Sequence, residues 1–221
     1  MKRISLSFVL TTLLLVLAAC QNEVPLAPIK AVSVQDFPNA VGSTWEYYVI
    51  DNLQPVDPNK PEYIIDTVYV SIDRYATDPQ TGSEAAVWAY LFNGDPLQQA
   101  PERPVITEGN IVYMYWNWKN ADKIGLVFPF DVRDSWHTGG LLSGDKTTVI
   151  DTTSMRVAAG QFSKVYVLKN ERRTTISTDS RIATLWFVPD LGIVKMHFRE
   201  IHAQSVGDTT WELVHHNNPY F

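Results

Sequence analysis

The chain has 221 residues, a formal net charge of −6, 45% hydrophobic and 12% aromatic residues, and one cysteine. An acidic chain with no run of Lys and Arg lacks the basic surface of nucleic-acid-binding proteins, which argues against nucleic acid as a partner. A single cysteine cannot form an intrachain disulfide, so an exported domain of this sequence has to be stabilised by its hydrophobic core.

Residues 1–19 have the pattern of a secretory signal peptide. Lys2 and Arg3 supply a positive start, an apolar run follows, and small residues precede Cys20, which is the order found in signal peptides. The apolar run is shorter than the roughly 20 residues that a transmembrane helix needs. Removal of residues 1–19 takes away two positive charges and no acid, so the formal charge changes from −6 to −8.

The segment Leu17-Ala18-Ala19-Cys20 resembles the lipobox of bacterial lipoproteins. The resemblance implies cleavage before Cys20, a diacylglyceryl group on its thiol and, usually, an acyl chain on the new amino group. Two or three chains hold a protein stably at a membrane, whereas one chain holds it only marginally. The alternative is an ordinary secreted protein with an incidental cysteine. We expect Cys20 to anchor the protein in a bacterial cell envelope.

Gln21 follows the expected lipidated cysteine. In enterobacterial lipoproteins an Asp at this place retains the protein at the inner membrane. Because Gln21 is not that Asp, the sequence favours the outer membrane.

Residues 20–36 comprise the lipidated cysteine and a flexible tether, because the segment contains Pro25 and Pro28 and has no hydrophobic period. From residue 37 to 221 we expect a single all-β domain. Segments rich in β-branched and aromatic residues alternate with Pro-, Asp-, Asn- and Gly-rich stretches that are typical of turns. Strands are predicted at 44–50, 64–72, 86–92, 110–116, 146–153, 163–169, 182–189, 192–198 and 209–215.

One hairpin is well specified by its turn. In LWFVPDLGIVKM, Pro189 is suited to begin a turn and Gly192 to adopt a positive φ angle. The sequence therefore predicts that strands 183–188 and 193–199 are antiparallel neighbours.

Several predicted strands are apolar on both faces, notably 86–92 and 111–118. A sheet with one face in water should alternate apolar and polar residues. We therefore expect antiparallel strands in a strongly curved sheet, a half-barrel or barrel, around an apolar interior; a sheet covered on both sides is the alternative. For the aromatic residues themselves, a role in the core is favoured over a role in a binding surface, because large rings dominate the buried area of small β domains. The candidate lining for a hydrophobic ligand is Trp88, Tyr90, Phe92, Met114, Trp116 and Trp118.

A short segment occurs twice in related form. FPNAVGSTW at 37–45 and FPFDVRDSW at 128–136 share Phe-Pro, a later Ser or Thr, and a final Trp. The pattern indicates either a recurring Pro-led approach to a strand, with Trp closing the core, or an ancient duplication.

The sequence contains no recognisable catalytic or metal-binding motif. The five histidines have no cysteine partners, and no Asp or Glu repeats at the spacing of metal ligands, so no zinc signature is present. The nucleophile elbow, the phosphate-binding loop, the dinucleotide fingerprint and the acidic calcium loop are also missing. We predict no cofactor, no metal and no enzyme activity, although single residues from separate strands could still assemble a site.

Two segments in the last third of the chain, AAGQFSKVYVLK at 158–169 and WFVPDLGIVKM at 186–196, resemble segments of uncharacterised bacterial lipoproteins and related envelope β-proteins. The resemblance carries no catalytic residues. In architecture alone, the expected sheet is similar to the periplasmic lipoprotein-carrier and mycobacterial lipid-carrier folds. We thus expect an envelope lipoprotein that binds a lipid or another hydrophobic ligand. The alternative is a structural or interaction lipoprotein that contacts another envelope protein or a glycan.

Overall fold

The computed structural model describes residues 32–53, 64–79, 81–94, 99–115, 123–138, 145–173, 180–203 and 205–218. Residues Val32–Phe221 form one compact unit, and the description below concerns this unit. Val32 and Asp36 are buried, so the last residues of the predicted tether pack on the domain. Cys20, Trp116 and Trp118 lie outside the described residues.

Twelve antiparallel strands make up the unit, and the described residues contain no α-helix. This confirms the all-β prediction. None of the described residues belongs to a helix of the length and hydrophobicity needed to cross a membrane. The elements are a 3₁₀ turn η1 (Val34–Asp36) and strands β1 (Thr44–Asp51), β2 (Ile64–Thr77), β3 (Glu84–Phe92), β4 (Gln99–Glu108), β5 (Ile111–Tyr115), β6 (Lys123–Val127), β7 (Ser135–His137), β8 (Lys146–Val157), β9 (Gly160–Arg173), β10 (Ser180–Val188), β11 (Gly192–His202) and β12 (Ser205–Asn217).

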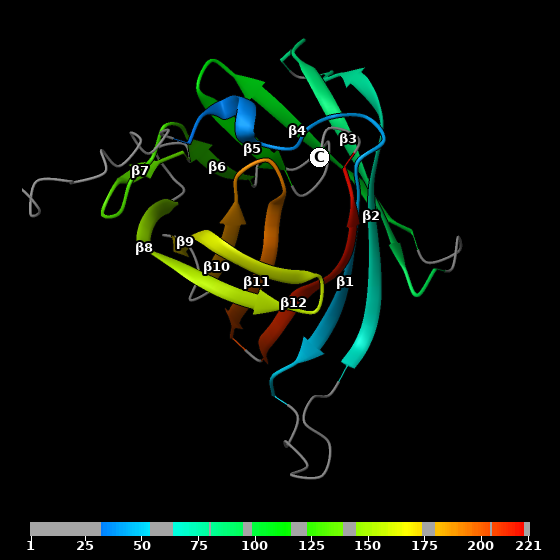
Figure 1. Cartoon of the computed structure of the whole chain (residues 1–221), viewed down its shortest axis with the longest axis vertical. Coiled ribbons are helices and arrows are strands. Elements are labelled where there is room, and N and C mark those ends of the chain that lie inside the picture. Colours follow the sequence, from blue (N-terminus) through cyan, green and yellow to red (C-terminus); the bar gives the residue numbers. More distant parts are fainter. Residues whose placement is uncertain are drawn as a thin grey trace, which may run out of the picture. The chain divides into compact units, whose positions relative to one another are not determined.

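The twelve strands form one sheet made of two six-stranded meanders. The strand order is β6-β5-β4-β3-β2-β1-β12-β11-β10-β9-β8-β7, so each meander pairs its strands in sequence and β1 joins the two by pairing with β12. The sheet bends strongly, with β12 following β1 along the joint between the meanders (Figure 1). The expected strongly curved sheet is confirmed as a nearly closed barrel.

The two end strands of the sheet, β6 and β7, meet through side chains. Trp136 on β7 donates a hydrogen bond from Nε1 to the carbonyl oxygen of Gly125 on β6, at 2.8 Å. Gly125 leaves room for Thr138, because a Cβ at Gly125 would lie 2.4 Å from the Thr138 Cγ2. This contact brings the ends of the sheet together without pairing their backbones.

The predicted hairpin is present as β10 and β11, which pair antiparallel. Residues 189–191 form the turn, and Gly192 has the expected positive φ of 96°. A Cβ at Gly192 would lie 2.8 Å from the Pro38 Cγ, so this glycine also allows the segment before β1 to pack against the hairpin.

The two related segments found in the sequence, 37–45 and 128–136, lead into the first strand of each meander. Gly42 has φ of 93°, and Arg133, its counterpart, has φ of 81°. L-residues other than glycine seldom adopt such a conformation, so its presence at the same place in both segments is an informative similarity.

The backbone hydrogen bonds of these two segments also correspond one to one. In the first segment, the bonds run from Ser43 N to Ala40 O, from Gly42 N to Ile72 O and from Ile72 N to Ser43 O. In the second segment, the equivalent bonds run from Asp134 N to Asp131 O, from Arg133 N to Val149 O and from Val149 N to Asp134 O. A β-bulge follows Ile72 in the pairing of β2 with β3, and another follows Val149 in the pairing of β8 with β9. The equivalence of the two segments and of the bulges beside them favours duplication over chance recurrence.

Aromatic rings fill one end of the barrel, beside the β10–β11 turn. Phe37 stacks between Trp88 and Phe187, with ring centroids 6.1 Å away on each side. Trp45 stacks on Trp88 at 4.9 Å and donates a hydrogen bond from Nε1 to the Leu191 carbonyl oxygen at 2.9 Å. Buried aromatic pairs of this kind add stability beyond the area that they bury, so this cluster closes the end of the barrel as a rigid plug.

Candidate hydrophobic binding site

An apolar hollow lies inside the barrel next to this plug. Its unfilled volume is about 60 Å³ and it opens to solvent. Strands from both meanders contribute to it, because the curved sheet brings β3 and β4 opposite β10 and β11. The residues that line it are Tyr47, Val70, Trp88, Tyr90, Arg103, Val105, Met114, Tyr115, Ile124, Leu185, Ile193, Met196 and Phe198.

Three of the six candidate lining residues, Trp88, Tyr90 and Met114, line this hollow. Phe92 instead packs edge-on against Trp211, with ring centroids 6.5 Å apart. Trp116 and Trp118 fall outside the described residues. Whether the lining residues bind a ligand remains a prediction.

The lining residues of the second meander were missed by sequence reasoning. Leu185, Ile193, Met196 and Phe198 belong to predicted strands, but their patterns do not say which face points inward. Arg103 was missed because β4 contains Pro101 and Pro104, which read as loop residues. The alternation Arg103-Pro104-Val105 was the signal that could have placed Arg103 beside an apolar position on one strand face.

The phenols of Tyr47 and Tyr90 are neutral over the physiological pH range. Tyr47 donates a hydrogen bond to the Ile193 carbonyl oxygen at 2.7 Å, and burial, followed by the nearby Tyr90, raises its pKa well above the ordinary value. Burial also raises the pKa of Tyr90, against smaller lowering effects of the charge and hydrogen bond of Arg103. The hollow therefore presents aromatic surface and neutral hydroxyl groups.

The size of the hollow limits what enters it. A buried water needs about 10–15 Å³ of such space, so about 60 Å³ accommodates a small group or one end of an alkyl chain. A longer chain fits only if lining side chains move. Met114 and Met196 are suited to do so, because methionine is unbranched and has three rotatable bonds.

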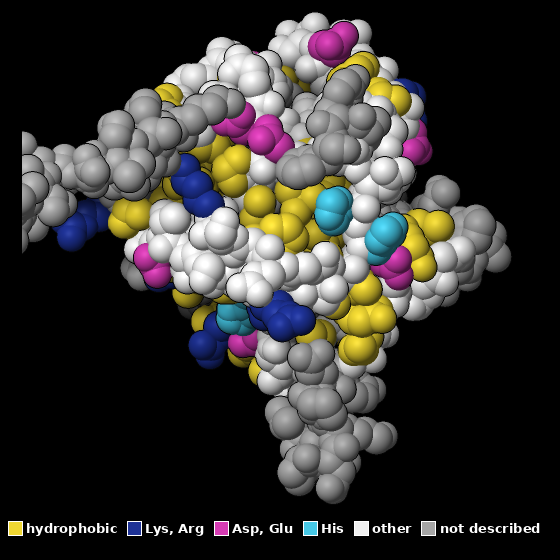
Figure 2. All heavy atoms as spheres, in the orientation of Figure 1, with side chains coloured by type: hydrophobic (Ala, Val, Ile, Leu, Met, Phe, Trp, Pro, Cys, Tyr) yellow, Lys and Arg dark blue, Asp and Glu magenta, His cyan; other side chains and the backbone are white. Residues whose placement is uncertain are grey.

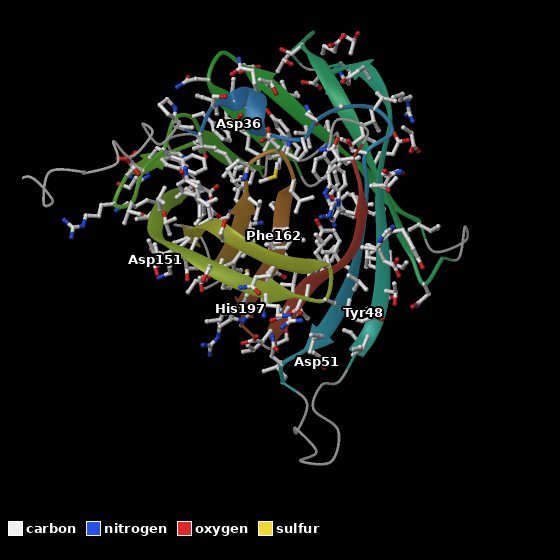
Figure 3. All side chains as sticks on the ribbon, in the orientation of Figure 1. Asp36, Tyr48, Asp51, Asp151, Phe162 and His197 are labelled. Atoms are coloured by element: carbon white, nitrogen blue, oxygen red, sulfur yellow. The ribbon has the colours of Figure 1, made fainter. Side chains whose placement is uncertain are left out.

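A polar cluster occupies the outer face of β11 and β12. His197 (Figure 3) approaches the Asp208 Oδ1 with its Nε2 at 2.7 Å. The Asn52 Nδ2 donates to the same Oδ1 and to the Thr210 Oγ1, both at 2.9 Å. Burial raises the pKa of Asp208, but the hydrogen bonds from His197 and Asn52 and the charges of His197 and Arg199 together lower it below its ordinary value.

Among the described residues, no three His, Cys, Asp or Glu side chains gather as a metal site would require. His197 and Asp208 form a pair of one histidine and one carboxylate. The cluster around Asp208 thus ties β11, β12 and the residue after β1 together.

Two solved structures share this architecture. A candidate lipoprotein from Parabacteroides distasonis superposes with a TM-score of 0.52 at 13% identity, over 85% of this chain and 100% of that chain. A candidate exported protein from Bacteroides fragilis, described as having a YmcC-like fold, gives a TM-score of 0.51 at 14% identity, over 85% and 99%. The chain has a YmcC-like fold. No protein-family model and no curated protein matches the sequence, and the YmcC-like fold by itself does not identify a ligand.

Proposed function

We propose that this protein is a lipid-anchored protein of a bacterial cell envelope, in the outer membrane, whose YmcC-like barrel binds a hydrophobic ligand. The observation that carries the proposal is the apolar hollow, which opens to solvent beside a filled aromatic plug. Concave sites lined by aromatic and aliphatic side chains with few polar groups are typical of ligand pockets.

Two further observations support the envelope location. The sequence before Cys20 resembles a lipobox, and the two proteins of similar fold are described as a candidate lipoprotein and a candidate exported protein. A protein held at a membrane by acyl chains is close to a pool of hydrophobic molecules, which gives the hollow a source of ligand.

The test uses the full chain with Cys20→Ser, exported to the periplasm and purified without detergent. We expect native mass spectrometry to show a bound molecule of low mass, and organic extraction to recover it as a hydrophobic compound. Val105→Phe places a ring in the hollow and should reduce its occupancy at least severalfold, because Val105 lines the hollow.

The matched control is Val206→Phe. Val206 is 42% exposed on β12 and does not line the hollow, so this variant should keep the bound molecule. Equal occupancy in both variants would place the ligand elsewhere on the protein. A protein that carries no ligand and binds neither decanol nor decanoate when these are added would contradict ligand binding.

The second candidate function is that of an interaction domain, and a surface feature of β2 favours it. Ile64, Ile65 and Tyr69 are 45%, 46% and 42% exposed on this strand, and Figure 2 shows that apolar side chains reach the surface on the viewed face. Exposed apolar groups that gather together mark contact surfaces. Recovery of one specific envelope partner after crosslinking, lost in Tyr69→Ser, would support this function.

A further inference from the structure

The hollow contains a cation where an apolar side chain would be expected. Among its described lining residues, Arg103 is the one charged side chain. Arg103 lies opposite Trp88 in the pairing of β3 with β4 and two residues before the buried Val105, so it is on the inner face of the barrel. A charged group placed in such surroundings loses hydration that its partners must replace.

The ring of Tyr90 holds the guanidinium in place. The Arg103 Cζ lies 4.2 Å from the centroid of the Tyr90 ring, within the range of a cation–π interaction. A guanidinium is planar, keeps its charge at all physiological pH values, and matches a carboxylate or phosphate with two parallel hydrogen bonds. The stacked position keeps this planar group against the wall of the hollow.

A second cation, Lys123, contacts Tyr115 from the outer face of the sheet. Tyr115, at the end of β5, lines the hollow, and the Lys123 Nζ donates a hydrogen bond to its hydroxyl oxygen at 3.1 Å. The same Nζ is 3.8 Å from the centroid of the Tyr113 ring. Because Lys123 precedes the inward Ile124 on β6, its ammonium lies outside the hollow, and Arg103 is the cation that the described lining presents to a bound anion.

We propose that the hollow binds a single-chain amphiphile with an anionic head, either a carboxylate or a phosphate, which pairs with the guanidinium of Arg103. The alkyl chain lies against the apolar side chains, among them Met114, Met196 and Phe198. This inference rests on the proposed function, because it names the class of ligand for the same hollow. A single chain is assigned because the volume of about 60 Å³ holds only one end of an alkyl chain, and movement of Met114 and Met196 has to provide the rest of the space.

The test compares four ten-carbon ligands that differ only in their head group: decanoate, decyl phosphate, decanol and decyltrimethylammonium. Their affinities for the full chain with Cys20→Ser are measured by isothermal titration calorimetry below micellar concentrations. We expect at least one of the two anions to bind roughly tenfold or more tightly than decanol, since a hydrogen bond to a charged group contributes about 1.5–3 kcal/mol. The cation should bind least tightly.

Variants of Arg103 separate recognition of the ligand's head group from burial of its alkyl chain. Arg103→Met should weaken the preferred anion roughly 10- to 100-fold and leave decanol within about threefold. Arg103→Lys keeps the charge but loses the planar fork, and its loss should be intermediate. Arg156→Met is the matched control, because Arg156 is exposed on β8 and does not line the hollow, and it should bind all ligands like the parent.

The outcomes test the anionic head group separately from the hydrophobic site of the proposed function. Binding of decanol as tightly as both anions would overturn the anionic head while leaving the hydrophobic site intact, and this comparison needs no variant to fold. Equal losses of decanol and anion in Arg103→Met would also overturn it, because they indicate a structural role for Arg103. Failure of all four ligands to bind to a protein that also carries no bound molecule would instead overturn the proposed function. Preference for decanoate or for decyl phosphate identifies the head group.

Discussion

At the scale of single residues, the outer face shows how Asp208 joins three parts of the chain. The carboxylate accepts a hydrogen bond from Asn52 after β1 and contacts His197 on β11. Because these partners favour the ionised form, the pKa of Asp208 lies below its ordinary value even though burial acts in the other direction. The cluster therefore contributes stability that depends on pH.

We expect Asp208→Asn to weaken the acid dependence of stability. A carboxylate whose folded-state pKa is lower than its unfolded-state pKa, about 3.9, stabilises the fold above the unfolded value and loses this contribution as the pH falls through the folded value. The variant should lose up to about 1 kcal/mol of unfolding free energy at pH 7 and show a shallower decline below pH 4. Urea unfolding from pH 7 to pH 3 measures both.

The control for this prediction is Asp151→Asn. Asp151 is exposed on β8, and its carboxylate accepts a hydrogen bond from the adjacent Thr152 amide. This substitution should leave the acid slope unchanged. Identical slopes in the parent and in Asp208→Asn would show that the Asp208 cluster does not couple folding to pH.

At the scale of elements, the contact between β6 and β7 decides how completely the barrel closes. β7 has three residues and pairs with β8 on one side. On its other side it reaches β6 through the hydrogen bond from Trp136 to Gly125. Since no backbone pairing crosses this junction, the space above Gly125 is what allows the close approach.

Gly125→Ala should therefore destabilise the fold by about 1–3 kcal/mol, the usual cost of overpacking. The new Cβ would lie 2.4 Å from the Thr138 Cγ2 and 2.7 Å from its Cβ, so rotation of the threonine side chain cannot remove both contacts. In Gly207→Ala, the control on β12, the nearest atom would be 3.9 Å away, and the change should stay within about 0.5 kcal/mol. Thermal and urea unfolding measure the stability of the two variants. Equal losses of stability in Gly125→Ala and Gly207→Ala would contradict a close contact between β6 and β7 at Gly125.

At the scale of the whole molecule, the proposed function combines a tethered position with a hollow domain. We expect the wild-type protein to incorporate an alkyne-labelled fatty acid and to fractionate with membranes, because two or three acyl chains anchor stably. Cys20→Ser should abolish the label and release the protein into the soluble periplasmic fraction. A wild-type protein that carries no label would contradict the lipid anchor without bearing on the hollow.

The sequence by itself determined the class of the fold and much of its local structure. All nine predicted strands have counterparts, and the β10–β11 turn follows from Pro189 and Gly192, because alternation of side chains and turn chemistry are local properties. The paired segments before β1 and β7 were also visible in the sequence. β4, β6 and β7 were missed, since β4 contains prolines and the other two strands are short.

Only the tertiary structure decided which faces point inward and what they enclose. Strand alternation defines two faces but does not say which one is buried when both are apolar, and that choice depends on how strands distant in sequence close the sheet. In the closed sheet, Trp88 lies between the plug and the hollow, and Phe92 packs against Trp211. Closure also turned Arg103 toward the hollow. No neighbouring residue in the sequence indicates that this charge lies inside the barrel.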